Sequence, residues 1–207
     1  MKVLLVNGSP HQFGCTYTAL CEVEESLKGE GINTELIHIG TKPIPGCIAC
    51  GKCKKNTDNL CMFDDLVNEI KVKTKAADGF VFGSPVHYAS ASGGITSFLD
   101  RLFYSSSSFA YKVGATVVSA RRAGTTAALD QLNKYLTISN MMLVGSQYWN
   151  MVHGNSPDEV RQDEEGLQTM RSLGRNMAWL LRSIESGRHA GIPTPSPEPK
   201  LRTNFIR

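Results

Sequence analysis

Short apolar runs alternate with segments of helical periodicity along most of the chain. Five runs are apolar, or alternate apolar and polar positions, as buried and half-buried strands do. They lie at residues 2–6, 32–39, 79–83, 113–119 and 141–148. The segments between them space their apolar residues three and four apart, which is typical of helices packed on one face. These helices are expected to carry Ala19, Leu20, Val23 and Leu27 on the first apolar face and to cover residues 65–76, 94–104 and 125–136 further on. Such alternation predicts an α/β fold with a doubly wound, five-stranded parallel sheet.

Two helix starts can be read directly. Ser156, Pro157, Asp158 and Glu159 combine an N-cap serine, a proline at the first helical position and two acids in the first turn. The helix that follows is expected to run to about Ser186. Asp64 is the expected N-cap of the helix over residues 65–76.

Length and composition favour a single-domain enzyme. The chain has 207 residues, a hydrophobic fraction of 41% and a net charge of +3. Residues 1–190 are expected to form one domain and residues 191–207 an extended, proline-rich tail. We find no basic stripe with interleaved aromatic residues, no apolar run of about 20 residues and no signal peptide. Nucleic-acid and membrane binding are therefore not expected, and the cytoplasm is the expected location.

The loop after the first strand has the features of an anion site. Residues 7–16 turn from a buried strand into a helix through Gly8, Ser9, Gly14 and Thr16, and they contain no acidic residue. Free backbone N–H groups, two hydroxyls and the positive end of the helix dipole would meet there. In a doubly wound sheet, ligands bind beyond the carboxyl ends of the strands. The loops after Gly83 and Ser119 should reach the same edge.

The three loops together resemble those of the flavodoxin-like NAD(P)H-dependent FMN reductase and quinone reductase family. The similarity covers residues 1–150 and rests on three pieces, which are Gly8-Ser9-Pro10 with Gly14 and Thr16, Ser84-Pro85-Val86 with Tyr88, and Leu99-Asp100-Arg101. It implies a three-layer α/β/α fold with FMN as cofactor and NADH or NADPH as co-substrate. It also implies three groups of cofactor-binding residues: Ser9, His11, Gly14, Cys15 and Thr16 at the phosphate; Pro85, Val86, His87 and Tyr88 along the flavin ring; Ala120, Arg121, Arg122 and Gly124 on its other side.

The chemistry of these residue types agrees with that resemblance. A flat isoalloxazine needs an aromatic or backbone wall, which His87 and Tyr88 could supply. Arg121 or Arg122 could favour the reduced flavin, which is anionic near N1, or could bind a phosphate of the pyridine nucleotide. We therefore expect an FMN-dependent oxidoreductase that moves electrons from NAD(P)H or an iron–sulfur cluster to a quinone, flavin or similar acceptor. No nucleophile or catalytic triad is expected. The alternative is a flavodoxin-like electron carrier that has no small-molecule substrate.

A four-cysteine segment lies within residues 46–64. Cys47, Cys50, Cys53 and Cys61 begin with the two-residue gaps of ferredoxin-type [4Fe–4S] loops. Structural zinc sites more often use two separated pairs of cysteines, and an empty loop is a third possibility. With the flavin loops, this segment resembles the iron–sulfur flavoproteins of the same superfamily. That resemblance implies that the four cysteines are cluster ligands near a subunit interface. The neighbouring residues Lys52, Lys54 and Lys55 could offset the negative charge of such a cluster.

The end of the chain suggests assembly into a homodimer or homotetramer. Residues 148–154 are aromatic and apolar, and they could complete a pocket or meet a second subunit, although Trp149 is expected to pack in the core. The tail has a polyproline-like spacer followed by Leu201, Phe205 and Ile206. We expect these three side chains to anchor the tail on the body or on a neighbouring subunit.

Overall fold

A parallel sheet forms the centre of the molecule. The computed structural model describes residues 1–105, 109–199, 201, 203 and 205. Its strands are β1 (Lys2–Asn7), β2 (Asn33–His38), β3 (Gly79–His87), β4 (Ser90–Ala91), β5 (Val113–Ala120), β6 (Met142–Leu143) and β7 (Met151–His153). The strand order is β2-β1-β3-β5-β6, with β7 also paired to β5 and β4 paired to the end of β3. The β3–β4 pair is antiparallel and the other pairs are parallel, which confirms the predicted doubly wound sheet.

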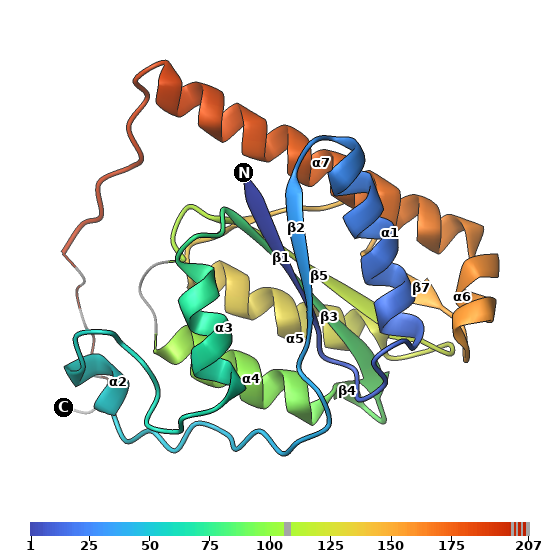
Figure 1. The fold of residues 1–207 in the computed structure, drawn as a ribbon, viewed down its shortest axis with the longest axis horizontal. Helices are drawn as coiled ribbons and strands as arrows, with labels where there is room; N and C mark the ends of the chain where they lie inside the picture. Colours follow the sequence, from blue (N-terminus) through green and yellow to red (C-terminus); the bar gives the residue numbers. More distant parts are fainter. Residues whose placement is uncertain (106–108, 200, 202, 204, 206–207) are drawn as a thin grey trace.

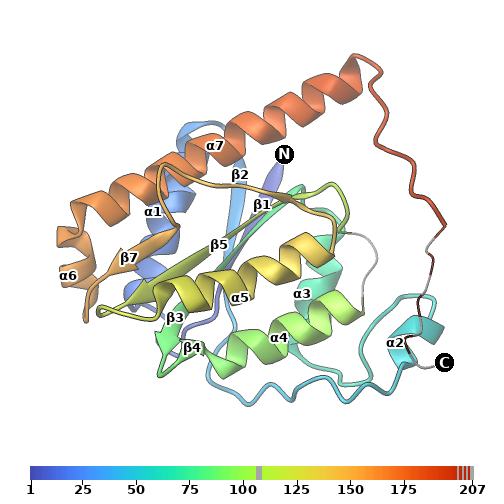
Figure 2. The same cartoon turned by 180° about the vertical axis from the view of Figure 1, so that it is seen from behind.

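Helices cover both faces of the sheet. They are α1 (Cys15–Gly29), α2 (Lys52–Lys55), α3 (Leu66–Thr74), α4 (Gly93–Tyr104), α5 (Thr125–Ile138), α6 (Pro157–Gln162) and α7 (Glu164–His189). Helices α3, α4 and α5 lie on one face, and α1 and α7 lie on the other (Figures 1 and 2). The three-layer α/β/α arrangement is confirmed. No helix of the described residues combines the length and apolarity needed to cross a bilayer.

Strand alternation explains why there are two cores. Leu4 and Val6 of β1 pack under α3, α4 and α5, whereas Val3 and Leu5 pack against α1 and α7. All four side chains are at most 1% exposed. Successive side chains of a strand point to opposite faces, so one short apolar run supplies both cores and fixes the sheet between the helix layers.

The fifth strand is shorter than predicted and is divided. Strand formation was expected over residues 141–148, but β6 covers only two of them and β7 begins at Met151. Between the two strands the chain leaves the sheet in a polar turn. Ser146 Oγ donates to Tyr148 O at 2.6 Å, and Asn150 Nδ2 donates to Val144 O at 3.4 Å. These side-chain bonds to the backbone replace the sheet pairing and return the chain to β5 further along.

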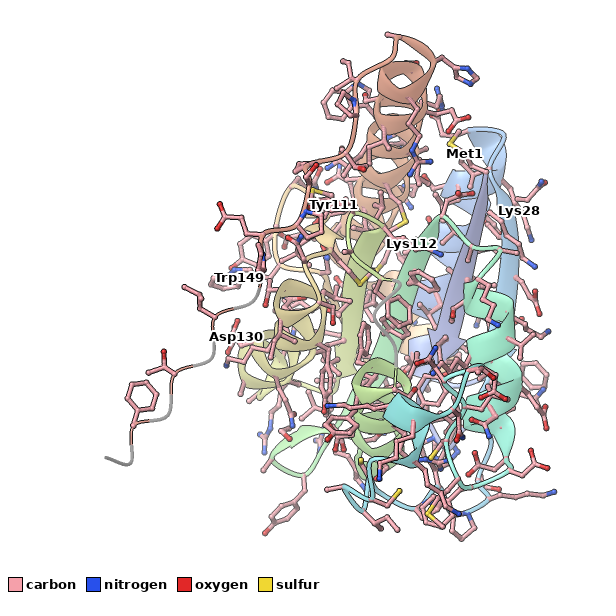
Figure 3. The ribbon with its side chains drawn as sticks, turned by 90° about the vertical axis from the view of Figure 1, so that its left-hand side faces the viewer. Met1, Lys28, Tyr111, Lys112, Asp130 and Trp149 are labelled. Carbon is pink, nitrogen blue, oxygen red and sulfur yellow. The ribbon has the colours of Figure 1, made fainter. Side chains whose placement is uncertain are left out.

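Trp149 does not pack in the core as expected, because it lies on this turn. Its side chain is 55% exposed, and its ring lies 5.0 Å from that of Tyr148. Figure 3 shows it at the outer surface of the molecule.

Two helix boundaries differ from their predictions. Asp65, not Asp64, is the N-cap of α3, since its carboxylate accepts from Val67 N at 3.1 Å. Ser156 caps α6 as predicted, but the helix ends at Gln162 and does not continue to Ser186. Asp163 caps a new helix, α7, by accepting from Gly166 N at 2.9 Å. A capping aspartate favours non-helical backbone at its own position, which explains the break.

The tail after α7 runs down beside the body (Figure 1), and its last described part projects into solvent (Figure 3). Leu201 is 96% exposed and Phe205 is 91% exposed, so these two side chains do not pack on their own domain. Ile206, the third expected anchor, lies outside the described residues. Anchoring on a neighbouring subunit stays a prediction.

Candidate functional site

The carboxyl ends of β1, β3 and β5 bring the three predicted loops to one edge of the sheet. Gly8 N donates to Gly83 O at 2.8 Å, which joins the first loop to the second. Thr16 and Ser119 share a hydrogen bond of 2.8 Å between their buried hydroxyls, which joins the first helix to the end of β5. The loops therefore form one site although they are distant in the sequence.

Two helix N-termini at this edge begin at glycines. The N-caps of α1 and α5 are Gly14 and Gly124, which have no side chain to bond the free N–H groups. Neither helix has an acidic residue in its first turn. By contrast, Asp65, Ser92 and Asp163 cap α3, α4 and α7 with their side chains. The N–H groups and positive dipole ends of α1 and α5 are thus available to an anionic ligand.

The first loop is shaped by its own hydrogen bonds. Ser9 N donates to Asn7 Oδ1 at 3.0 Å, and His11 N donates to Ser9 Oγ at 3.1 Å. The Ser9 side chain is buried, whereas His11 is exposed. His38, at the end of β2, bonds Ser9 O through Nε2 at 2.8 Å. These contacts hold the loop open in front of the α1 N-terminus, so it is preorganised before any ligand binds.

The second loop is a short hairpin. Val86 and His87 of β3 pair with Ala91 and Ser90 of β4. Pro85 and Val86 are half-buried, whereas Tyr88 is fully exposed in the turn with a positive φ of 64°. The wall of this loop therefore consists of backbone, Pro85 and Val86, with His87 at its rim.

The third loop meets the second through Gly124. Its φ is +89°, and a Cβ there would lie 2.9 Å from Val86 Cγ1. Arg121 and Arg122 are exposed on this loop, whereas Ala120 is buried at the end of β5. The two arginines are therefore free to meet a ligand from solvent.

Residues 148–154, for which the sequence left two roles open, also reach the site. Strand β7 pairs with the end of β5, so that His153 lies beside Ala120. Gly154 N donates to Ala120 O at 3.0 Å, and Cys15 Sγ donates to Gly154 O at 3.6 Å. Burial raises the pKa of the Cys15 thiol, with a smaller contribution from Glu159, so this thiol is a neutral neighbour of the α1 N-terminus. The aromatic and apolar character of residues 148–154 was the one signal for this placement.

A groove of about 410 Å³ runs along the other side of the first loop. Its lining includes Pro10, residues 40–44 of the β2–α2 connection, His87 and the first turn of α4. Because His87 belongs both to the hairpin and to the lining of the groove, the groove opens beside the edge formed by the carboxyl ends of β1, β3 and β5.

The four cysteines line a second pocket, away from the strand ends. Cys47, Cys50, Cys53 and Cys61 all face it, together with Phe63, Arg101 and Tyr104. Cys53 is buried in α2, and Cys47 and Cys50 are exposed. No set of three or more His, Cys, Asp or Glu side chains in the described part of the chain is gathered closely enough to hold one metal ion. The thiols therefore share a pocket without forming a closed single-ion site of the structural zinc type.

Two buried cations adjoin this pocket, and the sequence alone gave neither of them a role beside the cysteines. The Arg101 side chain, on α4, is 0% exposed and forms an ion pair with Asp65. Lys71, on α3, is buried and donates from Nζ to Ser105 O at 2.7 Å and to Ser105 Oγ at 2.8 Å. The expected cations Lys52, Lys54 and Lys55 are exposed instead.

The cations respond to burial in different ways. Burial lowers the pKa of Lys71, and the nearby sulfurs of Cys53 and Cys61 partly offset this effect. Burial also acts against the Arg101 cation, but the hydrogen bonds to Asp65 and Cys61 outweigh it and raise its pKa. A positive charge beside the sulfurs is therefore secured mainly by Arg101.

Comparisons with known proteins identify the family to which the chain belongs. A family model described as NADPH-dependent FMN reductase matches residues 1–156. An iron–sulfur flavoprotein of Methanocaldococcus jannaschii is 32% identical over 194 residues, which are 89% of this chain and 100% of that protein. A NADPH azoreductase of Bacillus sp. (strain OY1-2) is 28% identical over 66% of this chain and 68% of that protein.

Solved structures show the same fold. A flavone reductase superposes with a TM-score of 0.68 at 18% identity, over 89% of this chain and 64% of that one. A WrbA-like flavodoxin from Agrobacterium tumefaciens gives a TM-score of 0.62 at 16% identity, over 88% of this chain and 98% of that one. The fold is thus flavodoxin-like. Since the family model covers more than half of the chain, the protein belongs to the NADPH-dependent FMN reductase family.

Proposed function

We propose that this protein is an FMN-dependent oxidoreductase that carries electrons from NADH or NADPH, or from an iron–sulfur cluster, to a quinone, flavin or similar acceptor. The observation that carries the proposal is the pair of helices, α1 and α5, that each begin after a glycine N-cap at the edge formed by the three loops. Both ends favour anionic groups, and an FMN molecule has an anionic phosphate and a ring that becomes anionic when reduced.

The residues present suit an FMN molecule. The N–H groups of Cys15 and Thr16, with the Ser9 hydroxyl, would hold the phosphate, and His11 would close the loop over it. The Thr16 hydroxyl would keep its bond to Ser119 and so fix the start of α1. Pro85, Val86 and the backbone up to Tyr88 would support one side of the ring, and residues 120–124 the other side. FMN, when bound, would supply the two-electron chemistry. The protein would orient the ring, exclude water from it and present Arg121 and Arg122 to the phosphates of the pyridine nucleotide.

The cysteine pocket supports a [4Fe–4S] cluster as a second redox group. Four thiolate donors at ferredoxin-type spacing face one pocket, and a buried guanidinium lies beside them. Cys47, Cys50, Cys53 and Cys61 would be the ligands. Iron and sulfide analysis of protein purified without oxygen tests this part of the proposal. An iron-free protein with a full complement of FMN would contradict the cluster and leave the flavin assignment intact.

The same pocket favours a second candidate function. An electron-transfer protein with no small-molecule substrate would need a redox group near the surface, and Cys47 and Cys50 are exposed. Steady-state NADPH oxidation with a quinone separates the two functions. A reductase would turn over with the quinone alone, whereas a carrier would turn over only when a protein partner is added.

The flavin site is tested by placing a charge at the first position of α1. Cys15→Asp puts a carboxylate where the helix dipole favours it but where it would repel the FMN phosphate. We expect FMN to bind about a hundredfold more weakly, which corresponds to about 2.7 kcal/mol, measured by quenching of flavin fluorescence. Cys15→Asn is the matched neutral control and should bind within a few-fold of the original protein. Equal affinities of the Asp and Asn variants would place the phosphate elsewhere.

A further inference from the structure

Cys61 is held in the pocket by side chains of two helices, α3 and α4. Asn68 holds its backbone on both sides: Cys61 N donates to Asn68 Oδ1 at 2.8 Å, and Asn68 Nδ2 donates to Cys61 O at 3.0 Å. Its sulfur accepts a hydrogen bond from Arg101 Nε at 3.3 Å. Cys47 and Cys50, by contrast, are exposed. One corner of the pocket is therefore preformed by the chain's own hydrogen bonds.

The guanidinium of Arg101 donates hydrogen bonds both to a carboxylate and to a cysteine sulfur. Nη1 and Nη2 bond the two carboxylate oxygens of Asp65 at 2.6 and 2.8 Å, in the bidentate geometry typical of arginine. This pairing orients the plane of the guanidinium so that its third nitrogen, Nε, donates to the Cys61 sulfur. An arginine that served only as the partner of Asp65 would not need a sulfur at that position.

Arg101 also joins the two ends of the cysteine segment. Nη1 donates to Pro45 O at 3.4 Å, just before the first cysteine, and Nη2 donates to Phe63 O at 3.3 Å, just after the last. The side chain is fully buried, so its hydrogen bonds act with little competition from water. A single α4 residue thus fixes both boundaries of the segment that would surround a cluster.

The geometry points to Arg101, oriented by Asp65, as a positioning residue for an iron–sulfur cluster in this pocket: its Nε–H bond fixes the Cys61 ligand and raises the reduction potential of the cluster. This inference rests on the cluster proposed above. A thiolate bound to iron is a better acceptor than a thiol, so the bond should strengthen when the ligand is metallated. Hydrogen bonds to ligand sulfurs stabilise the more negative, reduced cluster, and outer-shell partners help to retain the metal.

Two substitutions separate the hydrogen bond from general stability. Arg101→Lys keeps a cation that can pair with Asp65, but it cannot bond both Asp65 and the sulfur with the same fork geometry. We expect iron loss to a chelator to be about ten- to hundredfold faster, and the cluster midpoint potential to fall. Asp65→Asn keeps the N-cap of α3 but loosens the fork that orients Arg101, so iron loss should be faster than in the original protein and slower than in Arg101→Lys. Arg175→Lys, the same change on the exposed surface of α7, should alter neither quantity.

The experiment uses the full chain, reconstituted with iron and sulfide without oxygen. Midpoint potentials come from a redox titration followed by electron paramagnetic resonance, and FMN affinity and thermal unfolding of the iron-free protein report on folding. Faster iron loss in both variants, with a lowered potential in Arg101→Lys, supports the inference. If Arg101→Lys does not fold, faster iron loss from a normally folded Asp65→Asn supports it, and an unchanged rate overturns it.

Three other outcomes would also overturn the inference. Faster iron loss that is matched by an equal loss of thermal stability in the iron-free protein would mean general disruption of the pocket. A cluster that binds equally well and keeps its potential in Arg101→Lys would refute the role of Arg101 and leave the proposed function in place. If the original protein binds FMN but no iron, there is no cluster for Arg101 to position, and the inference is wrong.

Discussion

Gly124 shows how strongly the contact between the second and third loops depends on the backbone of one residue. With φ at +89°, it caps α5 and lies against Val86 of the neighbouring loop. A side chain at this position would be strained by the left-handed backbone and would also meet Val86. The contact between the second and third loops therefore requires glycine.

Gly124→Ala should accordingly cost about 1–2 kcal/mol of unfolding free energy and weaken FMN binding, because the two loops must separate. Urea unfolding and FMN titration measure the two effects. Gly29→Ala is the control, since Gly29 ends α1 and a Cβ added there would meet no atom within 4 Å. That variant should be stabilised by up to about 1 kcal/mol. Equal unfolding midpoints for the two variants would show that the Gly124 backbone relaxes freely.

Single residues also mark what the sequence could and could not predict. The spacing of Cys47, Cys50, Cys53 and Cys61 indicated a common set of ligands, and the four residues do line one pocket. Their role as cluster ligands stays a prediction. The cation beside them was not predictable in the same way. Arg101 follows the last cysteine by 40 residues, and its approach to Cys61 depends on how α4 packs. The nearby lysines were the natural choice from sequence, yet they are exposed.

At the scale of elements, periodicity predicted the strands and helices that bury one or two continuous faces. It failed where side chains bond the backbone. Asn150 and Ser146 close the turn that divides the fifth strand, and Asp163 separates α6 from α7. Such local bonds compete with regular structure but leave little trace in an apolar pattern.

The edge strand β2 is held by an ion-pair network that should depend on pH. Glu35 accepts from Lys2 Nζ of β1 at 2.6 Å and from Lys73 Nζ of α3. Hydrogen bonds from Lys2, and then from Lys73, lower the pKa of the Glu35 carboxyl. A lowered pKa in the folded state means that the charged form favours folding. This stabilisation is present above the unfolded-state pKa of about 4.3 and is lost as the pH falls through the folded-state value.

Glu35→Gln should therefore lower the unfolding free energy by about 0.5–1 kcal/mol at pH 7, and the difference should vanish on acidification below the folded-state pKa. Urea denaturation at a series of pH values measures it. Glu25→Gln, on the exposed side of α1, is the control and should change stability little at any pH. A difference for Glu35→Gln that persists in acid would mean that packing of the side chain, not its charge, stabilises the edge.

At the scale of the whole molecule, an apolar groove and exposed apolar side chains lie at the tail. Tyr111, Met142, Ile184 and Ile192 line a largely apolar groove of about 420 Å³ between α7, β6 and the first tail residues. The tail then carries Leu201 and Phe205 into solvent. An extended segment with exposed anchors gains little from order in a single chain, because ordering its backbone costs conformational entropy. A second copy of the chain would offset that cost by covering the anchors.

Deleting residues 192–207 should therefore reduce the assembly from the expected homodimer or homotetramer to a smaller species and lower the thermal unfolding temperature. Light scattering during gel filtration gives the mass, and calorimetry gives the temperature. A full-length variant with Leu201→Ser and Phe205→Ser should behave like the deletion, because the anchors and not the proline spacer supply the buried area. Thr194→Ser, in the spacer, should leave both quantities unchanged. If the deletion keeps the original mass and unfolding temperature, the tail has no part in assembly, and the subunits must meet through the domain itself.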